Sequence, residues 1–459
     1  MDNEQIVAGM LHRARTALAA FSVFDQARVD ACLRMMLLAF KAHAEALSRE
    51  VVEETGLGDY ASKLEKNTTS PDGIWYALKR KRSVGVIGSD PEKRLTYVAS
   101  PKGVLCSVAP TTNPNITVLF NAAFALKGRN VLIVAPHPRA KRTTRHTVEI
   151  LTRALAEAGA PEHLIQCVEE PSIECTQLLM RRCDVIIATG GAAMVQAAYS
   201  SGRPAFGVGP GNVQTILDKD VDYAQAAAQI VLGRSFDNGL ICAGNQSVIL
   251  PRTDQGEVVA ALQASGAHYV EDPNEVEKFR TALFPNGGPI NRRLVGQNAQ
   301  AIAREAGVEI PPETAAILLL GDSERIGAAD PLCGEKMCPV LVAFPYDTFE
   351  QAVEIAKTNL RYEGAGHTAV VHTNDEKKAE YCGTQLPVSR LLVNQPGIFA
   401  ANPALANGFN PTSTLGCGSW GNNSISENLT FEHLINISRI GWMRREEDIP
   451  TVEQIWEEA

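Results

Sequence analysis

The chain has 459 residues, too many for a single hydrophobic core, so two or three domains are expected. Its 45% hydrophobic and 21% charged residues are typical of a soluble globular protein, and a net charge of −9 argues against nucleic acid as the main partner. No apolar run approaches the roughly 20 residues of a membrane span, and the acidic, polar start lacks a secretory pattern. Ten scattered cysteines, without CxxC pairs or zinc-like His/Cys clusters, indicate a reduced cytoplasmic protein with no metal site.

Residues 4–55 carry apolar side chains at helical spacing and predict two helices, which end at the glycines of 55–58. Two interpretations of the first helix stay open: the opening element of a domain, or a docking tag that directs the protein to a microcompartment. Residues 82–100 form two strand-like runs around a turn at 89–92. Because an isolated hairpin cannot bury both faces, we expect it to pair with another segment or another subunit.

From 103 to 235 the pattern alternates between strands and helices. The predicted strands are 104–108, 130–134, 164–168 and 184–188, and the predicted helices are 117–126, 144–158, 173–181 and 192–200. Repeated βα units predict a parallel, doubly wound sheet, which binds nucleotides at the carboxyl ends of its strands. Thr189, Gly190 and Gly191 stand at one such end and precede a helix, so their N–H groups can face a pyrophosphate, although the chain has no GxGxxG motif here.

A second α/β block runs from about 212 to 415. Its predicted elements are strands at 316–320, 339–344 and 368–371 and a helix at 349–359, and a strand-like tail follows at 434–440. Within it, Cys242 lies among small residues just before the apolar run 248–250, where a nucleophilic thiol would be uncrowded and close to free N–H groups. The alternative interpretation is a buried structural cysteine.

Five stretches of the chain resemble the CoA-acylating branch of the aldehyde dehydrogenase superfamily: 110–114, 135–141, 189–191, 236–243 and 415–421. The resemblance covers essentially the whole chain. It implies an α/β fold with a Rossmann-type cofactor domain (1–81 and 101–211), an α/β catalytic domain (212–424) and a β oligomerisation extension (82–100 and 425–459). It also implies a homodimer or homotetramer in which a terminal strand extends a neighbour's sheet.

The resemblance further implies a mechanism in which Cys242 attacks the aldehyde, hydride leaves to NAD or NADP, and a thioester remains on the enzyme. Asn113 and the backbone N–H of Cys242 match the donors that stabilise the oxyanion. Gly207 stands where hydrolytic members of the superfamily carry a glutamate as the base for water. Because glycine cannot accept a proton, we expect coenzyme A, a better nucleophile than water, to take the acyl group.

Several residues match cofactor-binding positions of the family. Glu335 matches the glutamate that binds the nicotinamide ribose, with a surface glutamate as the alternative. The remaining cofactor candidates are Thr112, His137, Arg139, Thr189, Gly190, Gly191 and Gly209. His137 and Arg139 belong to a basic run that would hold a phosphate of CoA or the 2′-phosphate of NADP, or would simply be a solvated helix start. The choice between NAD and NADP stays open.

Three residues are predicted around the substrates. His367 matches a histidine of the acylating branch and would help to deprotonate CoA, unless it is a hydrogen-bonded loop histidine. Cys417 would line the substrate pocket. Arg234 would hold a small anionic aldehyde such as sulfoacetaldehyde, together with polar residues such as Asn115, Asn410, Thr412 and Ser413. An acetaldehyde-like substrate, a hydrolytic enzyme that releases the acid, and a non-catalytic assembly protein with the same fold stay as alternatives.

Overall fold

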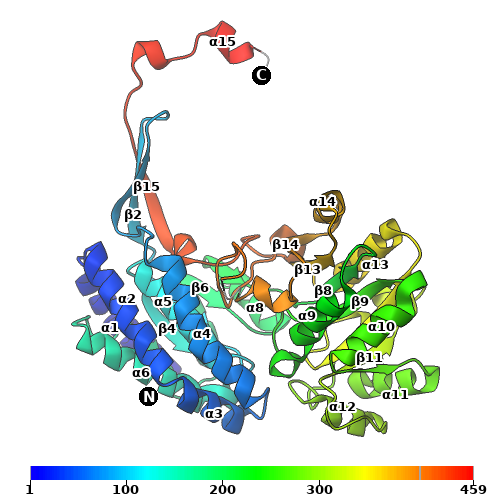
Figure 1. The fold of residues 1–459 in the computed structure, drawn as a ribbon. Helices are drawn as coiled ribbons and strands as arrows, with labels where there is room; N and C mark the ends of the chain where they lie inside the picture. Colours follow the sequence, from blue (N-terminus) through cyan, green and yellow to red (C-terminus); the bar gives the residue numbers. More distant parts are fainter. Residues whose placement is uncertain (1, 403–404, 458–459) are drawn as a thin grey trace.

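Residues 2–402 and 405–457 are described by the computed structural model, and they form two α/β lobes and a β extension (Figure 1). The first lobe contains a parallel sheet with the strand order β5-β4-β3-β6-β7. Its strands are β3 (Val104–Val108), β4 (Val131–Ala135), β5 (Ile165–Cys167), β6 (Val185–Ala188) and β7 (Ala205–Gly207). The sequence predicts all of them except β7.

The helices that alternate with these strands are α5 (Pro114–Lys127), α6 (Lys141–Glu157), α7 (Ile173–Arg182) and α8 (Ala192–Tyr199). They agree with the predicted helices within a few residues. The first lobe therefore has the doubly wound arrangement that the alternating pattern predicts, and the carboxyl ends of its strands lead into the loops at 109–113, 136–137, 189–191 and 208–212.

The N-terminal segment differs from the prediction. Residues 4–55 form three helices where two are predicted: α1 (Asn3–Phe21), α2 (Gln26–Ala42) and α3 (Ala44–Thr55), the last two separated only by His43. A fourth helix, α4 (Tyr60–Leu78), is not predicted at all. It contains a Thr-Thr-Ser-Pro run, which has low helix propensity, so its stability comes from packing against α2, α3 and α5.

Helix α1 is part of the first lobe. Val7, Met10, Ala14 and Phe21 are buried in the same core as the sheet. Arg15 at the middle of α1 also pairs with Asp184, which stands directly before β6. A detachable tag would leave its apolar face uncovered, so the structure favours the opening element of a domain over a docking tag.

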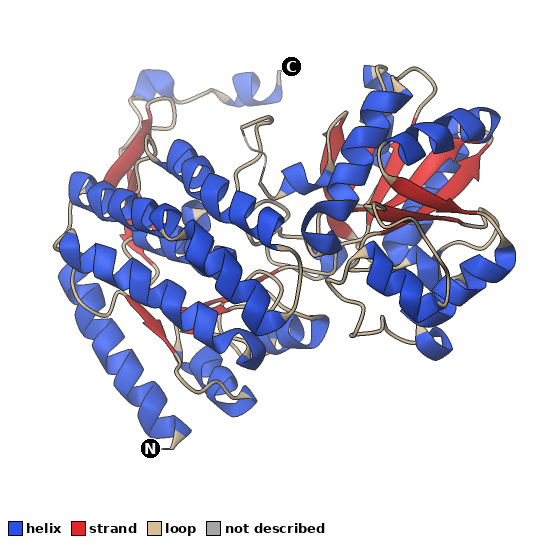
Figure 2. Cartoon of the chain, turned by 60° about the horizontal axis from the view of Figure 1, so that its bottom comes forward, coloured by secondary structure: helices blue, strands red, loops and turns tan. Residues whose placement is uncertain are grey.

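The second lobe contains a parallel sheet with the order β10-β11-β12-β9-β8-β13-β14. Its strands are β8 (Val213–Leu217), β9 (Asn245–Pro251), β10 (Ala267–Val270), β11 (Ala316–Leu320), β12 (Val340–Tyr346), β13 (Gly366–His372) and β14 (Val388–Val393). Its helices are α9 (Tyr223–Ser235), α10 (Gln255–Ala264), α11 (Pro273–Leu283), α12 (Ala299–Ala306), α13 (Phe349–Tyr362) and α14 (Glu376–Gln385). Figure 2 shows helices packed against this sheet and loops that run between the two lobes.

The two faces of the second sheet bury separate cores. Ile317 and Leu319 of β11 lie in one core, whereas Leu318 lies in the other. This alternation follows from the two-residue period of a strand, and it explains why β11 and β12 are continuous apolar runs. Both strands are predicted from that property, β11 with identical bounds.

The β extension is an antiparallel sheet with the order β1-β2-β15, in which β1 is Gly85–Asp90, β2 is Leu95–Pro101 and β15 is Ile435–Gly441. The segment that pairs with the hairpin is therefore the terminal strand of the same chain, with Ile435 opposite Pro101 and Gly441 opposite Leu95. Figure 1 shows this sheet projecting away from the lobes, with helix α15 (Val452–Trp456) beyond it.

The chain returns from the second lobe to the first before it enters β15. Leu415 and Cys417 pack with Val213 and Ala243 of the second lobe, whereas Leu429, Phe431 and Leu434 join the core of the first. This return segment therefore runs along both lobes. Within residues 2–402 and 405–457, no helix is both long enough and apolar enough to span a bilayer.

Candidate active site

Cys242 is half-buried and lies in the loop between α9 and β9. The loop reverses the chain through three consecutive residues with left-handed backbone angles: Asp237 (φ 53°), Asn238 (φ 50°) and Gly239 (φ 72°). Asparagine, aspartate and glycine are the residues that tolerate this conformation best, which explains the Asp-Asn-Gly sequence. The turn presents Cys242 directly before β9.

The structure corrects the interpretation of Arg234. Its side chain is fully buried and donates to the carbonyl oxygen of Gly239 (2.6 Å) and to that of Asn245 (3.1 Å). These carbonyls lie on either side of Cys242, so Arg234 holds the two ends of the nucleophile loop together and is not exposed to a bound substrate. The sequence alone does not separate these two roles, because an arginine directly before this turn could either brace the loop or face a bound substrate.

The unliganded environment keeps the Cys242 thiol protonated. Burial first, and then the carboxyl group of Glu335 and the Cys417 thiol, raise the pKa of this thiol to about 12 against the opposing positive charge of Arg390. At neutral pH the sulfur is therefore a thiol, so ligand binding has to supply either a proton acceptor or a compensating donor before attack.

The loop from 207 to 212 packs directly on the nucleophile. A Cβ atom at Gly211 would lie 1.9 Å from the Cys242 carbonyl oxygen, so only glycine fits there. The Gly211 N–H donates to Glu335 Oε1 (3.2 Å), and a Cβ at Gly209 would lie 3.5 Å from Cys417 Sγ. Four predicted site residues, Cys242, Glu335, Gly209 and Cys417, are thus brought together around one loop.

Gly207 ends β7 and is packed against α8. A Cβ at this position would lie 2.6 Å from a methyl group of Val195 and 3.1 Å from the ring of Tyr199. The backbone N–H of Gly207 donates to the Tyr199 hydroxyl (2.9 Å). The position therefore lacks a base and also lacks the room for one, because Val195 and Tyr199 occupy the space next to it.

Glu335 is half-buried and lies beside a second half-buried acidic residue, Glu363. Its backbone N–H donates to Glu363 Oε2 (2.7 Å). Burial, and then the negative charge of Glu363, raise the pKa of Glu335 to about 8, so its carboxyl group is largely protonated at neutral pH in the unliganded protein. Two vicinal ribose hydroxyls would supply hydrogen bonds that favour its ionised form.

His367 stands near the start of β13 and is fully buried. Its Nδ1 lies 3.0 Å from the Thr368 hydroxyl, and its Nε2 is buried without a hydrogen-bond partner. Burial, helped by the positive charge of Arg390, lowers the pKa of His367 to about 3, so the ring is a neutral imidazole and a weak base. Arg390 donates to the carbonyls of His367 (2.8 Å) and Gly416 (2.9 Å), which ties His367 to the glycine-rich segment that carries Cys417.

Asn113 is half-buried and is the N-cap residue of α5. Its side-chain oxygen accepts a hydrogen bond from Lys66 of α4, and Lys66 also donates to Asp237 of the nucleophile loop. Lys63 donates to Asp237 Oδ2 (2.8 Å) and to the carbonyl of Thr112 (2.7 Å). The two lysines therefore connect the Thr112–Asn113 loop to the loop of Cys242. Sequence reasoning missed them, and the only available signal was a Lys-x-x-Lys spacing on a polar segment.

The basic run at 137–142 is held by the chain itself. The His137 side chain accepts from the N–H of Arg139 (3.1 Å), and Arg139 donates to the carbonyl of Thr55 (3.2 Å). The N–H groups of Arg142 (2.9 Å) and Thr143 (2.7 Å), at the start of α6, both donate to the carboxylate of Glu54. A carboxylate thus occupies the anion-binding position of this helix start, which leaves the exposed His137 and Arg139 as the groups available to a ligand.

A cavity of about 650 Å³ lies between the lobes. It is lined by α8, by the loop with Gly209, by residues 360–365 and by Trp420 to Asn422. Space next to Gly191, at the start of α8, is open, so a phosphate group has room to approach the Thr189-Gly190-Gly191 turn. The cavity and the open space at this turn leave room for an extended dinucleotide or CoA, which would approach Cys242 along Gly209; the half-buried Glu335 does not line the cavity but is bonded to Gly211 of the same loop.

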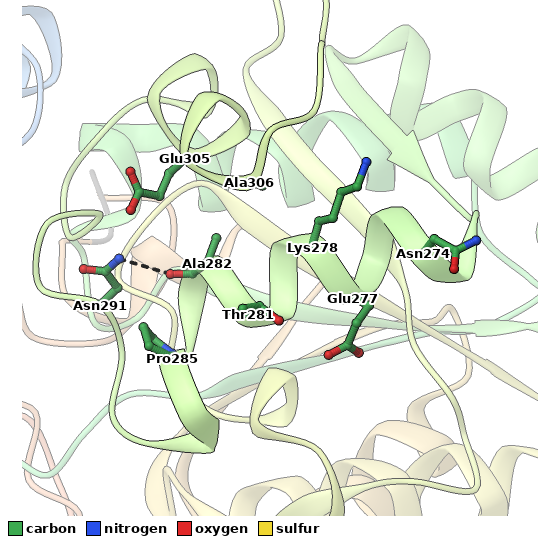
Figure 3. Close-up of a pocket in the computed structure, with 9 residues that line it drawn as sticks. All are labelled: Asn274, Glu277, Lys278, Thr281, Ala282, Pro285, Asn291, Glu305 and Ala306. Carbon is green, nitrogen blue, oxygen red and sulfur yellow. Dashed lines mark hydrogen bonds between the residues drawn. The ribbon is translucent and has the colours of Figure 1, made fainter.

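A second pocket, of about 490 Å³, is formed by α11, α12 and the segment between them (Figure 3). Glu277, Lys278 and Asn274 spread apart along α11, and the one hydrogen bond drawn joins Asn291 to the carbonyl of Ala282 (3.1 Å). None of the predicted site residues lines this pocket. Over the part of the chain that the structure describes, no group of three or more His, Cys, Asp or Glu residues has a metal-binding arrangement.

Residues 2–283 match the model of the aldehyde dehydrogenase family. The chain is 51% identical over 456 residues to a succinate-semialdehyde dehydrogenase (acetylating) from Clostridium kluyveri, covering 99% of this chain and 100% of that protein. The fold resembles an acetylating aldehyde dehydrogenase from Geobacillus thermoglucosidasius (TM-score 0.93, 35% identity, 98% of each chain). It also resembles a propionaldehyde dehydrogenase from Rhodopseudomonas palustris with bound CoA and an acylated cysteine (TM-score 0.83, 25% identity, 95% of this chain and 97% of that chain). The predicted fold class is confirmed, and the chain belongs to the aldehyde dehydrogenase family.

Proposed function

We infer that this protein is a CoA-acylating aldehyde dehydrogenase, which oxidises an aldehyde to its acyl-CoA with NAD or NADP as the hydride acceptor. Similarity to acetylating and CoA-binding enzymes over almost the whole chain supports this function. The observation that carries it within the site is Gly207, because Val195 and Tyr199 fill the space that a catalytic base would need. Without that base, water is a poor acyl acceptor, whereas a thiol is a good one.

The proposed roles follow from the chemistry of the residues. The Cys242 thiol releases its proton to solvent, and its sulfur bonds to the aldehyde carbon while the carbonyl electrons move onto oxygen. The Asn113 amide and the Cys242 N–H stabilise that oxyanion. Glu335 would hold the ribose hydroxyls of the nicotinamide cofactor, which would supply the hydride acceptor for the same carbon. The thioester left on Cys242 is then exchanged with the CoA thiol, which frees the cysteine.

The test is to follow nicotinamide reduction with and without CoA. We expect a burst of about one reduced nicotinamide per active site without CoA, because Cys242 is acylated once and not released, and sustained turnover only with CoA. Cys242→Ala serves as the control and should show neither phase. Sustained turnover without CoA would favour the hydrolytic enzyme, and an inactive wild-type protein would favour the non-catalytic assembly protein.

We propose a small anionic aldehyde as the substrate, with succinate semialdehyde and sulfoacetaldehyde as the first candidates. The similarity to the Clostridium kluyveri enzyme supports a carboxylate-bearing aldehyde. Arg234 is excluded as its partner by burial, the Asn115 amide N–H donates to the carbonyl of Leu47, and the Thr412 hydroxyl donates to the carbonyl of Leu429. Ser413 keeps a buried hydroxyl that has no hydrogen-bond partner among residues 2–402 and 405–457. If kcat/KM for acetaldehyde equals that for every anionic aldehyde, this preference is wrong.

We propose that the protein is a cytoplasmic homodimer or homotetramer assembled through the β extension. Ten free cysteines support a reducing compartment. Beyond β15, Trp442 (61% exposed), Met443 (88%) and Trp456 (81%) leave a large apolar surface uncovered, which supports contact with a second copy. Light scattering after size-exclusion chromatography should give a multiple of the 49.4 kDa chain mass, and removal of residues 442–459 should reduce it.

A further inference from the structure

We propose that Lys66 is a positioning residue that fixes the orientation of the Asn113 amide, and that Asp237 links this arrangement to the loop of the nucleophile. The inference rests on the roles proposed above for Asn113 and Cys242. It adds three residues, Lys63, Lys66 and Asp237, that neither sequence reasoning nor the comparisons assign.

The first step concerns the two ends of the Asn113 side chain. An ammonium group donates hydrogen bonds and cannot accept them, so the Asn113 atom that contacts Lys66 is the amide oxygen. The amide nitrogen therefore points away from Lys66, and it has no acceptor among the hydrogen bonds of residues 2–402 and 405–457. Two N–H groups are left for a ligand, which is the orientation that an oxyanion requires.

The second step concerns polarisation. A positive charge on the amide oxygen draws electron density toward that oxygen and makes the N–H groups better donors. The side chain of Lys66 is 8% exposed, and burial lowers its pKa to about 8, so the ammonium form prevails at neutral pH. Buried surroundings also strengthen the effect, because water does not screen it.

The third step explains how Lys66 is held. Lys63 and Lys66 are three residues apart on α4, so their side chains share one face of the helix. Both reach the fully buried carboxylate of Asp237, whose other oxygen accepts from the N–H of Asp59 (3.2 Å). Because Asp237 precedes Cys242 by one turn of the same loop, a single buried carboxylate fixes Lys66, and through it Asn113, relative to the nucleophile.

The test is a double-mutant cycle of Lys66→Met and Asn113→Ala, measured as kcat for acyl-CoA formation with saturating aldehyde, nicotinamide cofactor and CoA. Asn113→Ala alone should lower kcat by roughly 10²–10³-fold, as for other oxyanion donors. Lys66→Met alone should lower kcat by roughly 10-fold or more with little change in KM, and should add almost nothing to Asn113→Ala, because the amide it orients is gone. Lys66→Arg should recover part of the loss.

Lys63→Met is the matched control. This substitution removes the other lysine that pairs with Asp237. In the Asn113 loop Lys63 contacts only the backbone carbonyl of Thr112, so the fold-loss in kcat from Lys63→Met should multiply with that from Asn113→Ala. Thermal unfolding checks that each variant is folded, and Lys66→Gln replaces Lys66→Met if the latter is not. Multiplicative effects of Lys66 and Asn113 substitutions would overturn the role of Lys66 alone. An unchanged kcat in Asn113→Ala would overturn the proposed role of Asn113 and this inference together.

Discussion

The loop of Cys242 contacts two groups of residues, here called walls, that are built in opposite ways. The charged wall consists of three buried residues, Lys63, Lys66 and Asp237, and the half-buried Asn113, which are joined by hydrogen bonds between their side chains. The glycine wall consists of Gly207, Gly209 and Gly211, which bring backbone close to Cys242, Cys417 and α8. The charged wall depends on groups that must be present, and the glycine wall on atoms that must be absent. The two should therefore fail in different ways when they are altered.

The charged wall should be the more costly to break. Asp237→Asn keeps the size of the side chain and suits the left-handed backbone, but it leaves Lys63 and Lys66 buried without a counter-charge. We expect the free energy of unfolding to fall by about 3–5 kcal/mol, which urea denaturation followed by circular dichroism would measure.

An exposed ion pair gives the matched comparison. Lys141→Met breaks the Lys141–Glu170 pair (2.6 Å), whose Glu170 side chain is 79% exposed, so the loss should stay within about 1 kcal/mol. If Asp237→Asn lowers the free energy of unfolding by no more than Lys141→Met does, the charges of the charged wall do not stabilise one another.

The glycine wall should lose activity more than stability. In Gly211→Ala the new methyl group would meet the Cys242 carbonyl oxygen at 1.9 Å, so the nucleophile and its N–H must shift. Displacement of reacting groups by about 1 Å can lower the rate by roughly 10²-fold, and we expect a fall in kcat of that order. Steady-state kinetics with saturating substrates would measure it.

Gly209→Ala adds the same methyl group two residues earlier on the same loop. There the methyl would lie 3.5 Å from Cys417 Sγ, an ordinary van der Waals contact, so kcat should change by only a few-fold. Equal losses in the two variants would show that the close approach at Gly211 is not what positions Cys242.

The sequence predicts the glycine wall far better than the charged one. Gly207 and Gly209 belong to a run that resembles a family motif. Strands such as β3 and β11 are predicted within their observed bounds, because a short continuous apolar run is typical of a strand that is buried on both faces. Lys63 and Lys66 lie on α4, whose Thr-Thr-Ser-Pro run hides the helix, and their partner Asp237 is 171 residues or more away. The substrate-binding role predicted for Arg234 has the same weakness, because the burial of a side chain depends on packing partners that lie far away in the chain.

Glu335 connects the glycine wall to the nucleophile, because it accepts a hydrogen bond from Gly211 and raises the pKa of Cys242. Its folded pKa of about 8 lies above the ordinary value of 4.5, so its contribution to stability is fully present below about pH 4.5 and is lost as the pH rises toward 8. In Glu335→Gln this loss disappears, since an amide does not titrate. The unfolding free energy of wild type minus that of Glu335→Gln should therefore fall between pH 5 and 8, by at most about 1.4 kcal/mol per pH unit. A difference that stays constant across this range, measured by urea denaturation, would show that Glu335 is already ionised and that the thiol of Cys242 lies beside a carboxylate.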